Sequence, residues 1–288
     1  MSLSTRAAAP EAARAAPGGW EARLDLTFER DDARTVLATR KHVGPLRVQK
    51  ALYPEGPEVC QAIIVHPPGG IVGGDSLSIG IDVGALAHAQ LTTPGAAKWY
   101  RSAGPRAGAV TTLRIHEGAL LEWLPQETML FDGARASIAL SVELARESRY
   151  IGWDITCLGR TASGERYASG DLRQSTGISR DGSLLFCERA SIDGGSRLLQ
   201  SGAILKGAAV FGTLVAVGAP VNDEMLAGCR AVRCNTGEGA VTRLPEVFVA
   251  RYRGDSASAA RTYFATLWCL LRPHIAGRDA VTPRIWNT

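Results

Sequence analysis

The chain has 288 residues, of which 45% are hydrophobic and 21% charged, with a formal net charge of +4. These values are ordinary for a globular protein that can bury a sizeable core. Acidic residues are interspersed among the basic ones, most of which are arginine, so the sequence has no basic stripe of the kind that binds nucleic acid.

The cysteines and the N-terminal segment indicate a cellular compartment. Six cysteines are present, and none of them form a CxxC motif. Residues 1–19 lack the apolar core of a secretory signal, and no apolar run approaches the ~18 residues of a membrane span. We therefore expect a cytoplasmic protein with reduced thiols that does not insert into a membrane.

Residues 1–19 combine alanine, proline, glycine and charge without periodicity, which predicts a flexible arm followed by a single domain over residues 20–288. Apolar and polar residues alternate from Ala22 to Phe28, as in a half-buried strand. Similar segments recur at 76–83, 86–92, 110–116, 119–124, 136–144, 149–157, 184–191, 197–200, 208–217 and 247–252. This spacing predicts a mostly β fold, either a multi-stranded sandwich or a stacked-sheet (β-solenoid-like) domain.

Two helices are predicted in the C-terminal part of the chain. Residues 222–232 begin with Asn222 as N-cap, followed by acidic residues. Residues 255–271 carry apolar residues at helical spacing, and Arg272-Pro273 is expected to end that helix.

A glycine-rich loop, HPPGGIVGGD, interrupts two predicted strands, with His66 at its start and Asp75 at its end. The prolines and glycines predict a shaped binding loop. It lacks the lysine of a phosphate-binding loop, and a strand rather than a helix follows it, which argues against nucleotide binding. Asp75 has an alternative role, because aspartate often accepts backbone hydrogen bonds in turns.

Catalytic and tight metal-binding motifs are missing from the sequence. It has no HxxxH, HExxH or GxSxG pattern. Among the histidines only His66 is singled out, because it opens the glycine-rich loop. Isolated carboxylates such as Asp154 cannot be paired with a partner from the sequence alone.

Several long motifs, in one order, resemble the UreD (also called UreH) family of urease accessory proteins. HPPGGIVGGD is followed by LTTPGAAKWYRS, and RKHVGPLRVQKALYPEG, LEWLPQETMLFDGA, IGWDITCLGRTASGER and the C-terminal PRIWNT also match the family pattern. The resemblance covers residues 20–288. It implies a nearly all-β fold with two helices and a protein without catalytic turnover.

The resemblance also implies partners and a cargo. Such proteins are chaperones that dock on apo-urease with the UreF and UreG accessory proteins, and UreG supplies GTP hydrolysis. UreE is expected as a nickel donor to this complex. No tightly bound cofactor is implied, since nickel would be in transit through the protein toward the urease metallocentre.

The resemblance points to particular residues on the nickel path. By motif these are Asp75, Asp154 and Glu188, with His66 beside them, and we expect the carboxylates to face one internal, water-filled path. Carboxylates bind first-row cations more weakly than thiolates do, which suits a path that must release its ion. Ala97 replaces a hydroxyl residue of some relatives, so it offers no ligand.

Three questions stay open at the level of sequence. Arg284 and Trp286, near the C-terminus, are expected either to anchor a partner such as UreF or to fold back on the core. A hydrolase using Asp75 and Asp154 as a carboxylate pair is the alternative from another class. A third possibility is a pure adaptor that holds UreF against urease while nickel travels elsewhere.

Overall fold

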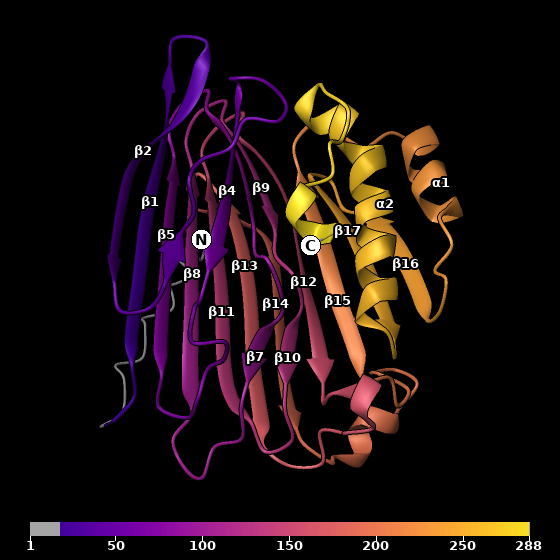
Figure 1. The fold of residues 1–288 in the computed structure, drawn as a ribbon. Helices are drawn as coiled ribbons and strands as arrows, with labels where there is room; N and C mark the ends of the chain where they lie inside the picture. The colour runs from indigo at the N-terminus through magenta and orange to yellow at the C-terminus, as the bar shows by residue number, and fades with distance from the viewer. Residues whose placement is uncertain (1–17, 288) are drawn as a thin grey trace, which may run out of the picture.

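A computed structural model describes residues 18–287 of the chain. The predicted arm lies almost wholly outside this range, and the single-domain boundary at residue 20 stays a prediction. The fold is mostly β, with the stacked, solenoid-like sheets and the two helices that the sequence predicts (Figure 1).

Seven strands form one of two large sheets, which we call the seven-stranded sheet. Their bounds are β1 Glu21–Asp31, β2 Arg34–Val43, β5 Ser76–Val83, β8 Ala107–Ile115, β11 Arg135–Leu144, β13 Asp171–Arg180 and β14 Ser183–Asp193. Their order across the sheet is β14-β13-β11-β8-β5-β1-β2. The strands from β1 to β13 pair in parallel, and β2 and β14 close the two edges in antiparallel pairs.

The second sheet, the ten-stranded sheet, faces the first. Its strands are β3 Arg47–Val48, β4 Val59–Val65, β6 His88–Thr92, β7 Ala97–Trp99, β9 Leu120–Leu124, β10 Thr128–Leu130, β12 Arg149–Leu158, β15 Val210–Val217, β16 Glu238–Arg243 and β17 Val247–Gly254. The main order is β16-β17-β15-β12-β9-β6-β4-β3, with β7 and β10 attached beside β12. From β5 to β13 the chain runs repeatedly from one sheet to the other, so each coil of the chain adds a strand to both layers.

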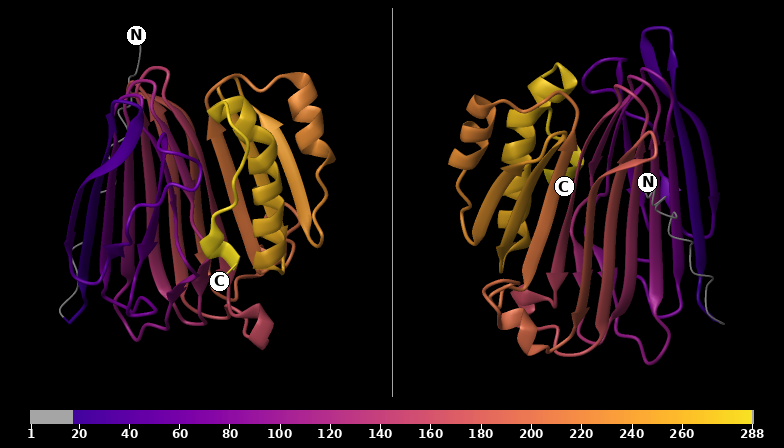
Figure 2. Two further views of the ribbon diagram at one scale, coloured as in Figure 1. Left: turned by 45° about the horizontal axis from the view of Figure 1, so that its top comes forward. Right: turned by 180° about the vertical axis from the view of Figure 1, so that it is seen from behind.

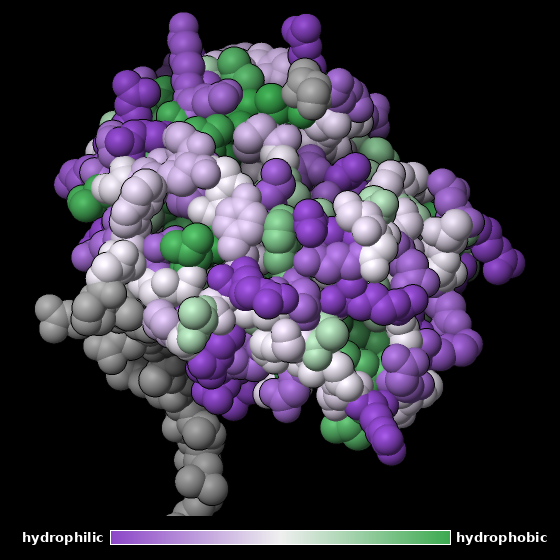
Figure 3. All heavy atoms as spheres, turned by 60° about the horizontal axis from the view of Figure 1, so that its bottom comes forward, coloured by the Kyte–Doolittle hydropathy of each residue, from purple (hydrophilic) through white to green (hydrophobic). Residues whose placement is uncertain are grey.

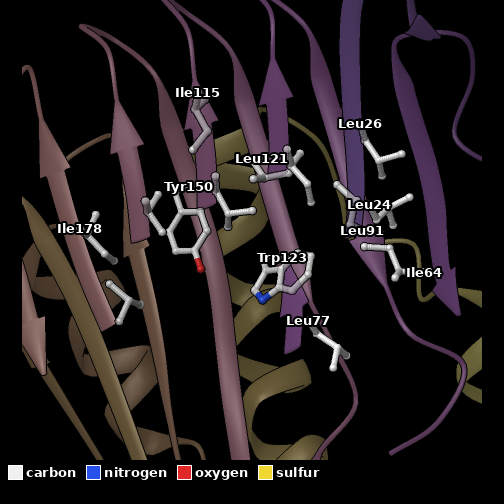
Figure 4. Packing of buried hydrophobic residues seen from close by; sticks show 14 of the residues in the cluster. Leu24, Leu26, Ile64, Leu77, Leu91, Ile115, Leu121, Trp123, Tyr150 and Ile178 are labelled. Carbon is white, nitrogen blue, oxygen red and sulfur yellow. The ribbon is translucent and has the colours of Figure 1, made fainter. Parts of the chain in front are cut away.

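The main core lies between the two sheets. Figure 4 shows side chains from both sheets pointing into this space, among them Leu24, Leu77, Trp123 and Tyr150. A second core lies on the opposite face of the ten-stranded sheet, where helix α2, Ala257–Ala276, packs on β12, β15 and β17. Figure 2 shows both helices on this one side of the strand stack. No helix between residues 18 and 287 is long and apolar enough to cross a membrane.

The shorter predicted helix is confirmed as α1, Asp223–Ala231, with Asn222 as its N-cap. The expected end of the longer helix at Arg272-Pro273 is wrong, since α2 continues through Pro273 to Ala276 and ends at Gly277, whose φ is 69°. Buried ion pairs of Arg272, described below, hold the backbone helical despite the following proline. The predicted strand at 197–200 is a 3-10 helix, Arg197–Gln200. A further 3-10 turn, Arg284–Asn287, closes the described chain.

Candidate functional site

The loop from His66 to Asp75 is held in place by the second motif of the sequence. Ile71 N–H donates to Lys98 O at 2.8 Å, and Tyr100 N–H donates to Ile71 O at 2.8 Å. A Cβ on Gly70 would lie 2.0 Å from the Tyr100 ring, so only glycine fits there. HPPGGIVGGD and TTPGAAKWYRS therefore form one structural unit through tertiary contacts, although Ile71 and Lys98 are 27 positions apart in the sequence.

Asp75 closes the loop by accepting backbone hydrogen bonds. Its Oδ1 accepts from Trp20 N–H at 2.9 Å and its Oδ2 accepts from Val72 N–H at 2.9 Å. The side chain is buried, with 6% exposure. Both carboxylate oxygens are therefore engaged in shaping the loop, which is the turn role that aspartate often takes.

A cavity of about 310 Å³ lies between the two sheets and is lined mostly by apolar side chains. Its polar lining includes His66, Thr111, Asp154, Gln174 and Thr176. Exposed residues of the glycine-rich loop and of the TTPGAAKW segment, among them Gly69, Pro94 and Lys98, also line the cavity, so the cavity reaches the surface there. Figure 3 turns this lower end of the strands toward the viewer and shows apolar residues lying among polar side chains.

His66 lies at the loop end of the cavity and is half-buried. Burial lowers the pKa of its imidazole, and the nearby Asp75 carboxylate opposes that shift. A histidine with a lowered pKa is neutral at pH 7 and keeps a nitrogen lone pair, which is the form that binds a transition metal.

Asp154 lies deeper between the sheets, on β12. It keeps some accessible surface because it lines the cavity. Burial, together with the carboxylate of Glu188, raises the pKa of Asp154 to about 7. Gln174 Nε2 donates to Asp154 Oδ1 at 3.1 Å. This carboxyl is therefore poised to exchange a proton, or a proton for a cation, near neutral pH.

Glu188, on β14, lies beside this end of the cavity but does not line it. Thr213 Oγ1 donates to Glu188 Oε2 at 2.9 Å, and Arg251 forms an ion pair with Glu188 Oε1. Asp154 and Glu188 thus form one charged neighbourhood, and His66 and Asp75 form another, with the cavity extending between His66 and Asp154.

The structure brings the predicted site residues together only in these two pairs. Asp75 and Asp154 do not face each other as a carboxylate pair, because Asp75 binds backbone amides and the charged neighbours of Asp154 are Glu188 and Arg251. Ala97 borders the cavity with a methyl group and supplies no ligand. Residues 18–287 contain no group of three or more His, Cys, Asp or Glu side chains that could hold a metal ion.

The C-terminal residues fold back on the outer face of the ten-stranded sheet. Trp286 Nε1 donates to Thr92 Oγ1 at 2.8 Å. Its ring centroid lies 5.7 Å from that of Trp153 and 6.0 Å from that of Trp268. Arg284 is exposed. Arg284 is therefore presented to solvent, whereas Trp286 packs against the core.

A second charged group, which we call the α2 network, lies on this outer face. Glu122 and Arg272 are both fully buried, and Arg272 Nε donates to Glu122 Oε2 at 3.0 Å. Trp268 Nε1 donates to Glu122 at 2.6 Å, and His88 Nε2 lies 2.7 Å from it. Glu55 pairs with Arg272 at 2.6 Å. Burial alone would favour neutral Glu122, but His88 and Arg272 outweigh it and lower the pKa of Glu122 to about 2.

Sequence reasoning missed Gln174, Thr213 and Arg251, which surround Asp154 and Glu188. Thr213 and Arg251 lie in predicted strands, but their neighbours follow from the cross-strand register, which a single sequence does not state. Gln174 lies in β13, which was not predicted. The α2 network was missed for the same reason, since Glu122 and Arg272 are 150 positions apart.

Comparison of the sequence with known proteins identifies a family. The family described as UreD urease accessory protein matches residues 21–287. A urease accessory protein UreD of Azoarcus sp. (strain BH72) is 53% identical over 277 residues, covering 96% of this chain and 97% of that protein. Proteins of the same name from Dechloromonas aromatica and Pseudomonas aeruginosa are each 52% identical, over 93% of this chain and 95% of their own length.

Proposed function

This chain belongs to the UreD family of urease accessory proteins and so has a role in urease maturation, and we propose that it conducts nickel through the cavity between its sheets. In this proposal it acts in the cytoplasm without catalytic turnover. It docks on apo-urease with UreF and UreG, whose complex uses GTP, and receives nickel from UreE. The observation that carries the proposal is the cavity of about 310 Å³ with His66 at one end and Asp154 toward the other.

The chemistry of the cavity suits an ion in transit. Imidazole and carboxylate groups bind Ni²⁺, and each neighbourhood offers few of them, so the ion is held weakly enough to move on. A carboxyl with a pKa of about 7 loses its proton when a cation arrives and regains it when the cation leaves. Asp75 supports His66 through its nearby negative charge, and Glu188 supports Asp154 as a second carboxylate.

The test is urease activation in cells that carry the whole urease gene cluster. Asp154→Asn should greatly lower urease activity and the nickel content of purified urease while complex formation persists. Asp82→Asn is the matched control, because Asp82 lies on β5 outside the core and pairs with His116. If Asp154→Asn urease carries normal nickel, the internal route is wrong.

A volume change separates conduction from the pure adaptor. Ala109 lines the cavity from β8, and Ala109→Leu would fill part of it. Conduction predicts that this variant still assembles with UreF and urease but no longer activates it, whereas Ala109→Ser behaves normally. Normal activation by Ala109→Leu would favour the adaptor. The hydrolase alternative has less support, because Asp75 is not available as a partner for Asp154.

A further inference from the structure

A row of polar side chains runs along the inner face of the ten-stranded sheet, from the cavity to the solvent. Asp154 on β12 is paired in register with Thr213 on β15, and Thr213 is paired with Arg251 on β17. Directly opposed residues of antiparallel strands project to the same face of a sheet. All three side chains therefore lie on the face that the seven-stranded sheet covers over the cavity.

The seven-stranded sheet no longer covers this row at Arg251. β14 is the edge strand of the seven-stranded sheet, whereas the ten-stranded sheet continues through β17 to β16. Glu188 on β14 reaches across to this row, where Thr213 and Arg251 contact it. The Arg251 side chain is 52% exposed and Glu188 is 28% exposed. The row therefore meets the solvent at the Arg251–Glu188 ion pair.

The guanidinium of Arg251 occupies the position that a cation would take beside Glu188. A cation approaching Glu188 would meet a fixed positive charge at short range, which repels it. It would also meet a carboxylate whose charge is already neutralised. Since the ion pair is partly exposed, its attraction is screened by water, and the long arginine side chain can move into solvent at low cost.

We propose that Arg251 closes the end of the nickel path at Glu188, opposite the loop end, and must leave Glu188 before a divalent cation can bind between Glu188 and Asp154. This inference rests on the proposed function, since it assigns a controlling residue to the same path. Arg251 acts here as a positioning residue: it does not bind nickel, and it determines when Glu188 can.

The test measures Ni²⁺ binding to the purified full-length protein by equilibrium dialysis. Arg251→Met should raise the affinity for Ni²⁺ at least about tenfold, because it removes a competing charge next to Glu188. The double substitution Arg251→Met with Glu188→Gln should cancel that gain. Arg251→Lys keeps the charge and should stay close to the unsubstituted protein. An unchanged affinity in Arg251→Met, or an equal gain in Arg251→Lys, would overturn the proposal.

Arg189→Met is the matched control. Arg189 follows Glu188 on β14 and is exposed on the opposite face of the strand, so its removal changes net charge equally without opening the path. If Arg251→Met does not fold, Arg251→Gln provides the same comparison. The failure of this inference is distinguishable from failure of the proposed function, because the Asp154→Asn urease assay does not depend on Arg251.

Discussion

Each face of the ten-stranded sheet carries a carboxylate, and the surroundings of the two carboxylates differ. On the outer face, Glu122 is fully buried and accepts hydrogen bonds from Trp268 and Arg272. On the inner face, Asp154 lines a cavity and receives one hydrogen bond from Gln174. The partners of Glu122 keep it charged, whereas Asp154 has a single hydrogen-bond donor and can still accept a further partner.

This difference separates structural charges from exchangeable ones. The pKa of Glu122 is lowered to about 2, whereas that of Asp154 is raised to about 7. Burial raises the pKa of both carboxyls, and at Glu122 the contacts with His88 and Arg272 outweigh it, whereas at Asp154 burial prevails and Glu188 adds to it. A buried acid marks a functional site here only where its hydrogen-bonding partners are few and a cavity adjoins it.

The largest expected effect breaks the outer group. Arg272→Met removes the cation between Glu122 and Glu55 and should lower the free energy of unfolding by about 3–5 kcal/mol, because uncompensated buried charge remains. The pKa of Glu122 is lowered from 4.5, so the stabilisation is present above pH 4.5 and is lost as the pH falls toward 2. Urea unfolding at several pH values measures both the stability lost in Arg272→Met and the pH dependence of the Glu122 contribution. Arg146→Met, which removes an exposed partner of Glu117, should leave the midpoint nearly unchanged.

The contribution of Asp154, on the inner face, to the free energy of unfolding should change with pH in the opposite direction. The folded-state pKa of Asp154 is raised from 3.8 to about 7, so the native state binds the extra proton between these values. Stability is therefore lost as the pH rises through 7. Asp154→Asn should remove this loss and exceed the unsubstituted protein by about 2–4 kcal/mol at pH 8, with little difference at pH 4. Parallel stability curves for the two proteins would contradict the assignment.

Trp286 tests whether the outer face is structural throughout. Trp286→Ala removes its contacts with Trp153 and Trp268 and its hydrogen bond to Thr92, so unfolding should become easier by about 2 kcal/mol. Thermal unfolding measures this, with Arg284→Ala as the exposed control. A Trp286→Ala protein of normal stability that no longer binds UreF would instead identify Trp286 as a docking anchor.

The smallest effect concerns the loop. Asp75→Asn keeps one acceptor oxygen but loses charge-assisted bonding to the Trp20 and Val72 amides, and should cost about 1 kcal/mol. Because Asp75 does not line the cavity and acts on His66 only through its nearby charge, Ni²⁺ affinity in equilibrium dialysis should fall only slightly. A large loss of affinity would instead place Asp75 on the path itself.

The sequence predicted those strands whose inward residues are apolar. β5 was predicted with its observed bounds, and β12 was one residue short at its end. β13 was missed because two of its inward positions are Gln174 and Thr176, which line the cavity rather than the core. The periodic pattern thus failed at a strand that serves the site, where a polar lining replaces the apolar one.

The predicted site residues were placed by motif, and their environments were not. Nothing near Asp154 or Glu188 in sequence indicates that the two carboxylates are neighbours, or that Arg251 contacts one of them. The contrast between Asp75 and Asp154 is only partly visible in sequence: the turn role of Asp75 was an alternative there, whereas nothing in the predicted strand 149–157 indicates the cavity beside Asp154. Their difference arises from which backbone amides and which cavity the fold brings to each.

The α2 network has a consequence for synthesis on the ribosome. Glu122 and Arg272 are 150 positions apart, so translation at 5–20 residues per second separates their appearance by roughly 7 to 30 seconds. Throughout that interval β9 carries an acidic side chain on a face that has no helix to cover it. A nascent chain therefore exposes the outer face of this sheet until α2 has been synthesised, and this face stays open to aggregation for that interval.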